Sequence, residues 1–365
     1  MTYGLGIDLG TTFTTAAVSS GGEPRMVPLS ERQAVLMRSV VRIEPDHLAV
    51  AGSTRSGSPA IAAHRFRRHL GDSKNLTVAG RTVNPAALLT TLLANVLDRV
   101  AWSEGAPPDQ VVLTCPAVWG PYRREQLIEI ARRAGLARHQ VTVVSEAEAV
   151  TAHHLLSHPL PDPALLAVYD LGGGSFDATL TYRHDRGTGG AGGTGVLGVL
   201  GVPESLEWFG GVDLDELILR QVDETSSGAL SLLEGRLPEQ AVTMDRVRQA
   251  CVRAKEKLST VPPDGQVLVQ APLPGQDRPV RISRAQLEGW TRPYLEAGLP
   301  SLRRAFESAG VHARDLSAVL LVGGMAHVPL VVSMLTDDLG RPPYVPSEPQ
   351  QVTALGAAAL AASAS

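Results

Sequence analysis

The pattern of apolar and polar positions divides the first 163 residues into short β-type runs and longer amphipathic segments. Residues 4–10 (GLGIDLG) and 13–20 (FTTAAVSS) flank a tight turn, so they predict a hairpin and not a strand followed by a helix. Irregular, Arg-rich residues follow to about 80. Beyond them we expect helices at 84–102, 121–136 and 146–157, buried strands at 111–119 and 141–145, and a Pro-rich stretch at 158–163.

The same opening pattern returns in the second half, where strands at 165–172 and 176–183 flank another glycine turn. A Gly/Thr tract at 186–195 interrupts a hairpin that continues at 196–202. The remaining pattern predicts helices at 210–222, 244–259, 283–310 (with breaks at Pro293 and Pro300), 329–340 and 351–362, and strands at 266–273, 280–282 and 316–324.

Because both halves open with strand, glycine turn and strand, the predicted fold class is α/β with a duplicated architecture of two lobes. Lobe I covers 1–160, with a smaller subdomain at about 34–106. Lobe II covers 164–349, with a smaller subdomain at about 212–284. The C-terminal helix within 350–365 is expected to pack back near lobe I.

Composition limits the class of partner. The 365 residues carry a net charge of −4, and the densest basic run is only six residues long, at 64–69, so we expect neither nucleic acid nor membrane as a partner. Cys115 and Cys251 lie far apart, which indicates a reducing compartment and no disulfide scaffold. With no leader-like or membrane-spanning run, we expect a cytoplasmic protein.

The two glycine turns carry the candidate chemistry. Asp8 and Asp170 each end a strand just before a turn whose backbone N–H groups can surround an anion. If the lobes face each other, both turns close on one polyphosphate, and two nearby acids then need Mg²⁺, held largely through water. Thr11, Thr12 and Ser175 add hydroxyl donors, and Asp177 can reach the same ion or a water. For a single turn the alternative is an ordinary hairpin whose Asp and Gly serve turn geometry; two in register make that alternative weak.

Other nucleotide-binding motifs fail their structural context. No G-x-x-x-x-G-K-[ST] occurs. A literal G-x-G-x-x-G at Gly187, Gly189 and Gly192 lies in the Gly/Thr tract with no helix directly after it, so it does not predict a dinucleotide fold.

Seven segments, in order along essentially the whole chain, resemble the nucleotide-binding domain of seventy-kilodalton heat-shock (DnaK-type) chaperones, within the actin-like ATPase superfamily. They are GIDLGTT, LTCPAVWGPYRREQLIEIARRAGL, VSEAEAVTAH, VYDLGGGSFD, WFGGVDLDELI, ACVRAKEKLS and LLVGGMAHVP. The resemblance implies a duplicated actin-like (ribonuclease H-like) fold with a nucleotide cleft between two lobes.

The resemblance also implies roles for single residues, with ATP or ADP and Mg²⁺ as cofactors. Asp8 and Asp170 would hold the metal through water, and the catalytic residues would be Glu146 and Asp177, which position the hydrolytic water, together with Thr11 and Arg67. The nucleotide-binding residues would be Gly10, Thr11, Thr12, Gly172, Gly173, Gly174, Ser175, Gly210, Gly211, Lys255, Ser259, Gly323, Gly324 and His327.

Three departures from the family pattern modify these expectations. Arg67, in FRRHLG, stands where the family has a catalytic Lys, so we expect nucleotide binding to survive better than turnover. Val252 replaces an acid near the ribose. Glu256 and His327 replace two arginines that stack on the base, so we expect weaker adenine affinity.

The chain ends in AALAASAS, without the linker and peptide-binding domain that follow this domain in the chaperones. We therefore expect a slow ATPase that acts as a two-state switch in ATP-dependent folding and the stress response, with a separate substrate-binding domain, a protein partner, a co-chaperone or an exchange factor reading the switch. The main alternative is a pseudo-ATPase that senses nucleotide. A small-molecule kinase and a filament-forming protein are weaker alternatives.

Overall fold

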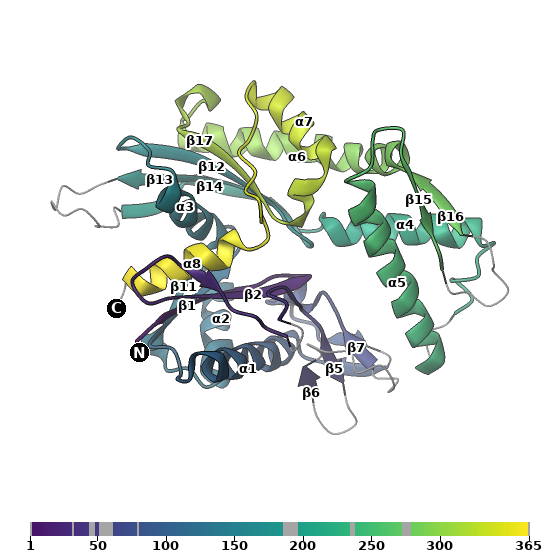
Figure 1. Ribbon diagram of the computed structural model, residues 1–365, viewed down its shortest axis with the longest axis horizontal. Coiled ribbons are helices and arrows are strands. Elements are labelled where there is room, and N and C mark those ends of the chain that lie inside the picture. Colours follow the sequence, from purple (N-terminus) through teal and green to yellow (C-terminus); the bar gives the residue numbers. More distant parts are fainter. Residues whose placement is uncertain are drawn as a thin grey trace.

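The computed structural model describes residues 2–30, 33–43, 48–50, 61–78, 80–184, 196–233, 238–271 and 279–363. Its two largest sheets come from the two halves of the chain (Figure 1). In the first sheet the strands lie in the order β11-β10-β1-β2-β3, and β4 also pairs with β2. These strands are β1 (Gly4–Leu9), β2 (Phe13–Ser19), β3 (Arg25–Met26), β4 (Met37–Arg38), β10 (Gln110–Cys115) and β11 (Val141–Ser145).

The second sheet has the order β14-β13-β12-β17 and repeats the plan of the first. Its strands are β12 (Ala164–Leu171), β13 (Phe176–His184), β14 (Val196–Leu206) and β17 (Ala318–Val322). In each sheet the opening pair is an antiparallel hairpin, β1 with β2 and β12 with β13, and the first strand of the pair also has a parallel neighbour, β10 or β17. The duplicated α/β architecture expected from the sequence is therefore confirmed.

Two helices fill the space between the sheets, and others cover the outer faces (Figure 1). Helix α3 (Glu146–Ser157) packs on β12, β13 and β14, helix α8 (Val352–Ser363) packs on β1, β2 and β10, and the two helices pack on each other. Helices α1 (Pro85–Glu104) and α2 (Pro121–Arg133) lie outside the first sheet, and α6 (Arg284–Ala309) and α7 (Pro329–Leu339) lie outside the second.

Glycine lets α8 approach the first sheet closely. A Cβ atom on Gly6 of β1 would lie 2.2 Å from the backbone nitrogen of Ala358, and one on Gly356 of α8 would lie 1.7 Å from the carbonyl oxygen of Ala149. Real Cβ atoms do not approach that closely, so these contacts require glycine. The C-terminal helix is thus fitted against both β1 and α3.

Smaller sheets and two further helices lie beside the main layers. The short strands are β5 (Val41–Ile43), β6 (Leu48–Val50), β7 (Ile61–Ala63), β8 (Leu76–Val78), β9 (Arg81–Val83), β15 (Gln266–Val269) and β16 (Val280–Ser283), and the helices are α4 (Gly211–Thr225) and α5 (Pro238–Leu258). In Figure 1, β5–β7 extend from the first sheet and α4, α5, β15 and β16 from the second. The subdomain boundaries remain a prediction.

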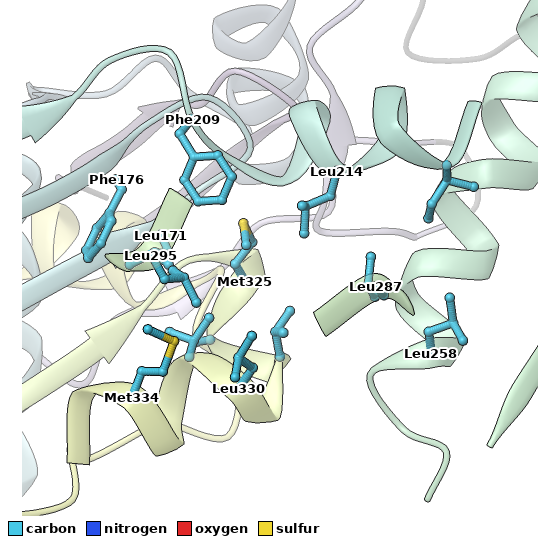
Figure 2. Packing of buried hydrophobic residues seen from close by; sticks show 14 of the residues in the cluster. Leu171, Phe176, Phe209, Leu214, Leu258, Leu287, Leu295, Met325, Leu330 and Met334 are labelled. Carbon is cyan, nitrogen blue, oxygen red and sulfur yellow. The ribbon is translucent and has the colours of Figure 1, made fainter. Parts of the chain in front are cut away.

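A continuous apolar core joins the second sheet to the α4–α5 region. It includes Leu171 and Phe176 at the sheet, Leu214 of α4 and Leu258 of α5. Figure 2 shows Phe209 and Met325 lying between Leu171 and Phe176 on one side and Leu214 on the other. This packing fixes α4 and α5 relative to the glycine turn of β12 and β13.

Several local predictions were wrong. Helix α6 runs through Pro293 and Pro300 without a break, because its packing on β13 and β14 compensates for the backbone hydrogen bonds that proline removes. The strand expected at 111–119 ends at Cys115, directly before Pro116.

The length and regularity of other segments were also misjudged. Helix α5 begins at Pro238 rather than at 244, and the strand expected at 266–273 ends at Val269. The segment expected to be irregular up to about 80 contains strands of two or three residues, too short to give a periodic signal. The Gly/Thr tract at 186–195 and the glycines of its G-x-G-x-x-G lie outside the described residues. No described helix has the length and hydropathy that a membrane crossing requires.

Candidate functional site: a cavity between two glycine turns

A cavity of about 510 Å³ lies where the glycine turns of the two sheets meet. The first turn contributes residues 8 and 10–13, and the second contributes 170 and 172–175. Arg67, Glu146 and parts of α4, α5 and the segments 323–328 and 349–353 complete its walls. Of the predicted site residues, the structure brings into these walls Asp8, Gly10, Thr11, Thr12, Arg67, Glu146, Asp170, Gly172, Gly173, Gly174, Ser175, Gly211, Lys255, Ser259, Gly323, Gly324 and His327.

The two turns pack directly against each other. A Cβ atom on Gly173 would lie 2.0 Å from Thr12 Oγ1, and one on Gly174 would lie 2.2 Å from Thr11 Oγ1. Glycine is required here for close approach of the two loops. The hydroxyl oxygen of Thr12 is buried and has no hydrogen-bond partner in the structure. A ligand oxygen in the cavity would supply the partner that a buried hydroxyl needs.

Buried acids give the cavity an unusual electrostatic character. Burial raises the pKa of Asp8 to about 6, helped by the nearby Glu146 and opposed by Arg67 and by Thr114, whose Oγ1 donates to Asp8 Oδ1 at 3.0 Å. Burial and the same Glu146 raise the pKa of Asp170 well above its usual range. Both carboxylates would therefore be stabilised by a cation in the cavity.

Asp177 lies behind the second turn and not in the cavity wall. It faces Asp170 across the hairpin, and its side chain accepts a hydrogen bond from Ser175 Oγ. Burial, followed by repulsion from Glu146, raises the pKa of Asp177 to about 7. The expectation that Asp177 reaches the bound ion or a water stays a prediction.

Glu146 reaches the cavity because α3 begins there. Ser145 caps the helix: its Oγ accepts from the Glu148 backbone N–H at 3.1 Å, and the Glu148 carboxylate accepts from the Ser145 N–H at 2.8 Å. This cap places Glu146 at the first helical position, where it is only 6% exposed. A carboxylate is favoured at a helix N-terminus by the helix dipole.

Arg67 forms an ion pair with Glu146 across the cavity wall. It lies on the short 3-10 helix Phe66–His69, and its guanidinium carbon lies 5.3 Å from the ring centre of Trp119. Burial opposes the charge of Arg67, but Glu146 and Asp8 overcome that effect and raise the pKa of Arg67. The cavity thus contains one buried arginine opposite Asp8, Asp170 and Glu146.

The N-terminus of α4 supports the second turn from behind. The backbone N–H of Gly211 donates to the carbonyl of Gly172 at 3.0 Å, and that of Val212 donates to Gly173 at 3.0 Å. Gly210 does not line the cavity, and a Cβ there would lie 2.7 Å from the backbone of Gly173 and Gly174. Gly210 therefore packs on the second turn and does not line the cavity, and its expected position near ribose and phosphate stays a prediction.

The far end of the cavity contains a buried ion pair. Lys255 Nζ lies 2.8 Å from Asp215 Oδ1 and donates to the carbonyl of Gly211 at 2.7 Å. Val252, Glu256 and His327 also line this end, at the positions where the sequence departs from the family pattern. The Lys255 charge is therefore already balanced by a protein carboxylate.

Gly323 supports Asp170 at the end of β12. Its φ of +84° is in the left-handed region, and a Cβ there would lie 2.5 Å from Asp170 Oδ1. Its backbone N–H donates to the Pro349 carbonyl at 3.0 Å, which connects the Asp170 site to the segment before α8.

Sequence reasoning missed several wall residues. Asp215 lies in the quoted segment WFGGVDLDELI, and its helical spacing four residues after Gly211 could have indicated that it faces the same way. The others come from segments whose proximity depends on the fold. The missed wall residues are Phe13, Asp215, Thr260, Met325, Val328, Pro349, Gln350 and Thr353.

Among the described residues, no three His, Cys, Asp or Glu side chains are close enough together to coordinate a metal directly. Two carboxylates that line one cavity suit a hard cation such as Mg²⁺, which keeps most of its own water. The raised pKa values of Asp8 and Asp170 and the unpartnered hydroxyl of Thr12 fit a site that a metal and an anion fill together.

A comparison with known protein families agrees with this geometry. The family model described as Hsp70 protein matches residues 60–365, well over half of the chain. Members of that family are nucleotide-binding ATPases of the chaperone type. The chain therefore belongs to the Hsp70 family, and its mixed α/β architecture agrees with the actin-like ATPase fold of that family.

Proposed function

We propose that this chain binds ATP with Mg²⁺ and hydrolyses it slowly to ADP and phosphate. The ATP-bound and ADP-bound forms would then be the two states of a switch. The observation that carries the proposal is that Asp8 and Asp170, from turns 162 residues apart in sequence, line one cavity together with Glu146. A polyphosphate between the turns would meet backbone N–H groups from both sides and the hydroxyls of Thr11 and Thr12.

Asp8 and Asp170 would hold Mg²⁺ through water, and the bound ion would neutralise charge that develops on the phosphates. Thr114 holds Asp8 in place through the hydrogen bond to Oδ1, and Gly323 packs on the Asp170 carboxylate. The chain's own contribution is thus to fix two carboxylates on opposite sides of the cavity. Either acid alone would leave one side of the ion without a protein partner.

In this proposal Glu146 orients the attacking water and accepts its proton. The water oxygen bonds to the γ-phosphorus while the bond from that phosphorus to the β,γ-bridging oxygen breaks, and ADP leaves with the electron pair. Arg67 holds the Glu146 carboxylate and brings the positive charge nearest to it. For Glu146 to contact water, this pair must loosen or share the carboxylate, which supports a slow reaction.

The same ion pair favours the alternative of a pseudo-ATPase that binds nucleotide with little turnover. If Arg67 keeps Glu146 occupied when nucleotide is bound, water has no free base, while the glycine turns still bind phosphate. Arg also differs from Lys in its wide planar group, which cannot occupy the same position beside an attacking water.

Single-turnover hydrolysis separates the two functions. We expect purified protein in excess over radiolabelled ATP to release phosphate slowly in the presence of Mg²⁺, and Glu146→Gln to reduce that rate by about 10²-fold or more, the range of a general base. Binding of Mg-ATP should survive in the variant. Equal phosphate release by both proteins would indicate a contaminant, and binding without release by either would establish the pseudo-ATPase.

Base recognition is proposed to be weak, because Glu256 and His327 line the cavity at the two positions where the family pattern has arginines. Neither side chain supplies the planar guanidinium that stacks on adenine. Glu256→Arg should tighten Mg-ATP binding in calorimetry by about threefold or more. An unchanged affinity would exclude this explanation.

We further propose that a protein partner in the cytoplasm, or a separate substrate-binding domain, responds to closure of the cavity.

A further inference from the structure

A second, smaller crevice adjoins the large cavity beside the two glycine turns. The two share Thr11, Arg67, Gly174 and Ser175 as walls. The crevice has a volume of about 30 Å³. Since about 10–15 Å³ of such space holds one water molecule, it suits a few waters or one small anion and excludes a nucleotide.

Arginines dominate the walls of this crevice. Arg67, Arg68 and Arg123 line it, and Glu207 is the one acidic residue among its walls. The guanidinium carbons of Arg67 and Arg123 lie 5.3 and 5.6 Å from the ring centre of Trp119, so this buried indole positions both of them. Arg67 and Arg68 are held by Glu146 and Asp213, which lie outside the crevice walls, so Arg123 is the arginine whose acidic partner lies in the walls. The forked guanidinium groups have a geometry that suits phosphate oxygens.

The pairing of Arg123 leaves it able to exchange partners. Arg123 Nη1 contacts Glu207 Oε1 at 2.5 Å, and the side chains of the pair are 28% and 41% exposed. An ion pair this exposed contributes on the order of 0–1 kcal/mol, so a dianion can compete with Glu207 for the guanidinium. Neither Arg123 nor Glu207 lines the large cavity.

We propose that this crevice is a binding site for orthophosphate, which holds the phosphate released from the γ position before it leaves the protein. The inference rests on the proposed ATPase function. Hydrolysis produces ADP and hydrogen phosphate beside Thr11, Gly174 and Ser175, and these are the residues through which the two spaces connect. Movement into the crevice forms and breaks only hydrogen bonds and ion pairs. While phosphate is held, the nucleotide cavity takes longer to become free of products. The protein therefore spends more time in the state that follows hydrolysis.

Titration of inorganic phosphate, followed by ³¹P NMR with the protein saturated with Mg-ADP, tests the site. Arg123→Gln should weaken phosphate binding by about threefold or more, because it removes a guanidinium from the wall. Glu207→Gln should strengthen binding by about twofold or more, because it removes the competing carboxylate. Arg132→Gln is the matched control: Arg132 lies on the same helix, is exposed and pairs with Glu129, so binding should not change. Saturable binding that is equal in all four proteins, or none in any, would overturn the proposal.

A kinetic measurement distinguishes product phosphate from phosphate taken up from solution. In single turnovers, quenched samples report hydrolysis and a fluorescent phosphate sensor reports release. We expect release to lag behind hydrolysis, the lag to shorten in Arg123→Gln and to lengthen in Glu207→Gln, and the hydrolysis rate to stay within about twofold. Release that coincides with hydrolysis in all three proteins would contradict the holding role.

The two proposals fail in distinguishable ways. If the protein hydrolyses no ATP, the proposed function fails, and the phosphate titration still decides whether the crevice binds the anion. If hydrolysis occurs and the titration shows no effect at positions 123 and 207, the crevice proposal alone fails. Circular dichroism of each variant verifies that the fold is intact.

Discussion

Arg67 stands where the family pattern has a lysine, and it differs from lysine in shape more than in charge. Its guanidinium pairs with Glu146 and lies beside Trp119, a position that a long planar group can reach and that fixes the carboxylate on one side. A compact ammonium on the same stem would make a single contact and leave more of the Glu146 carboxylate free for water.

We therefore predict that Arg67→Lys raises the single-turnover rate of ATP hydrolysis by about threefold or more. Arg65→Lys is the control on the same segment, because Arg65 pairs with Glu216 at 2.9 Å and does not line the cavity. An unchanged rate in Arg67→Lys would mean that Arg67 does not act near the phosphates.

His154 is buried near the C-terminal end of α3, where its ring contacts the more exposed rings of His158 and Tyr344. Its ring is stacked on His158 with centroids 4.4 Å apart, and Tyr344 packs edge-on at 5.1 Å. Burial, and then the neighbouring His158 and His153, lower the pKa of His154 to about 4. His154 therefore stays neutral in the folded protein at pH values where it is protonated in the unfolded chain.

Because the unfolded chain binds the additional proton between pH 6.5 and 4, the stability due to neutral His154 is lost as the pH falls through that window. The expected loss between pH 6.5 and 5 is about 1 to 2 kcal/mol. Urea unfolding at the two pH values should show a smaller change for His154→Gln than for the native protein. His139→Gln, at an exposed histidine, should keep the native change, and parallel results for both variants would refute the assignment.

At the scale of elements, α8 illustrates how close packing depends on a missing side chain. Helix α8 has six alanines and one glycine among its 12 residues, so its small side chains allow close backbone approach to β1 and α3. Gly356 is the tightest point, with the Ala149 carbonyl where a Cβ would be placed.

Gly356→Ala should reduce the free energy of unfolding by about 1 to 3 kcal/mol or more, since overpacking pushes α8 away from α3. Gly289→Ala is the matched control in α6, where an added Cβ meets nothing within 4 Å, and it should stabilise the protein by about 0.5 to 1 kcal/mol through helix propensity. Chemical denaturation of both variants measures the effects. If Gly356→Ala were neutral, the close contact would not be needed for the fold.

At the scale of the whole molecule, ion pairs connect segments that the cavity separates. Arg68 donates to both carboxylate oxygens of Asp213 at 3.3 and 2.7 Å, across 145 residues of sequence. Arg65 pairs with Glu216 on the same helix, α4. These contacts join the 3-10 helix beside Arg67 to the helix that supports the second glycine turn.

We predict that Arg68→Gln speeds ADP dissociation by about two- to fivefold, because opening then breaks fewer contacts. Stopped-flow release of a fluorescent ADP analogue measures the rate. Arg303→Gln is the control, since Arg303 pairs with Asp338 at 2.7 Å within the C-terminal half of the chain. Equal acceleration in both variants would indicate a general loss of stability in place of a contact across the cavity.

The sequence by itself determined the repeated hairpins and most long helices, because apolar periodicity and glycine turns are local properties. It also brought forward Asp8, Asp170, Glu146 and both turns as candidates, since these residues lie in short motifs. It could not place Pro349, Gln350 or Thr353 in the same walls, because their proximity depends on how the segment 349–353 folds back onto the turns.

Only the tertiary structure decided which side chains face each other. The pairing of Arg67 with Glu146, the position of Gly210 behind the second turn and the arginine crevice all join residues more than 35 positions apart. Continuous helix α6 shows the same principle, since packing along its length overrides the local effect of two prolines. Local pattern specifies elements, whereas contacts between distant segments depend on the packing of the complete chain, and the chemistry of this cavity is made of such contacts.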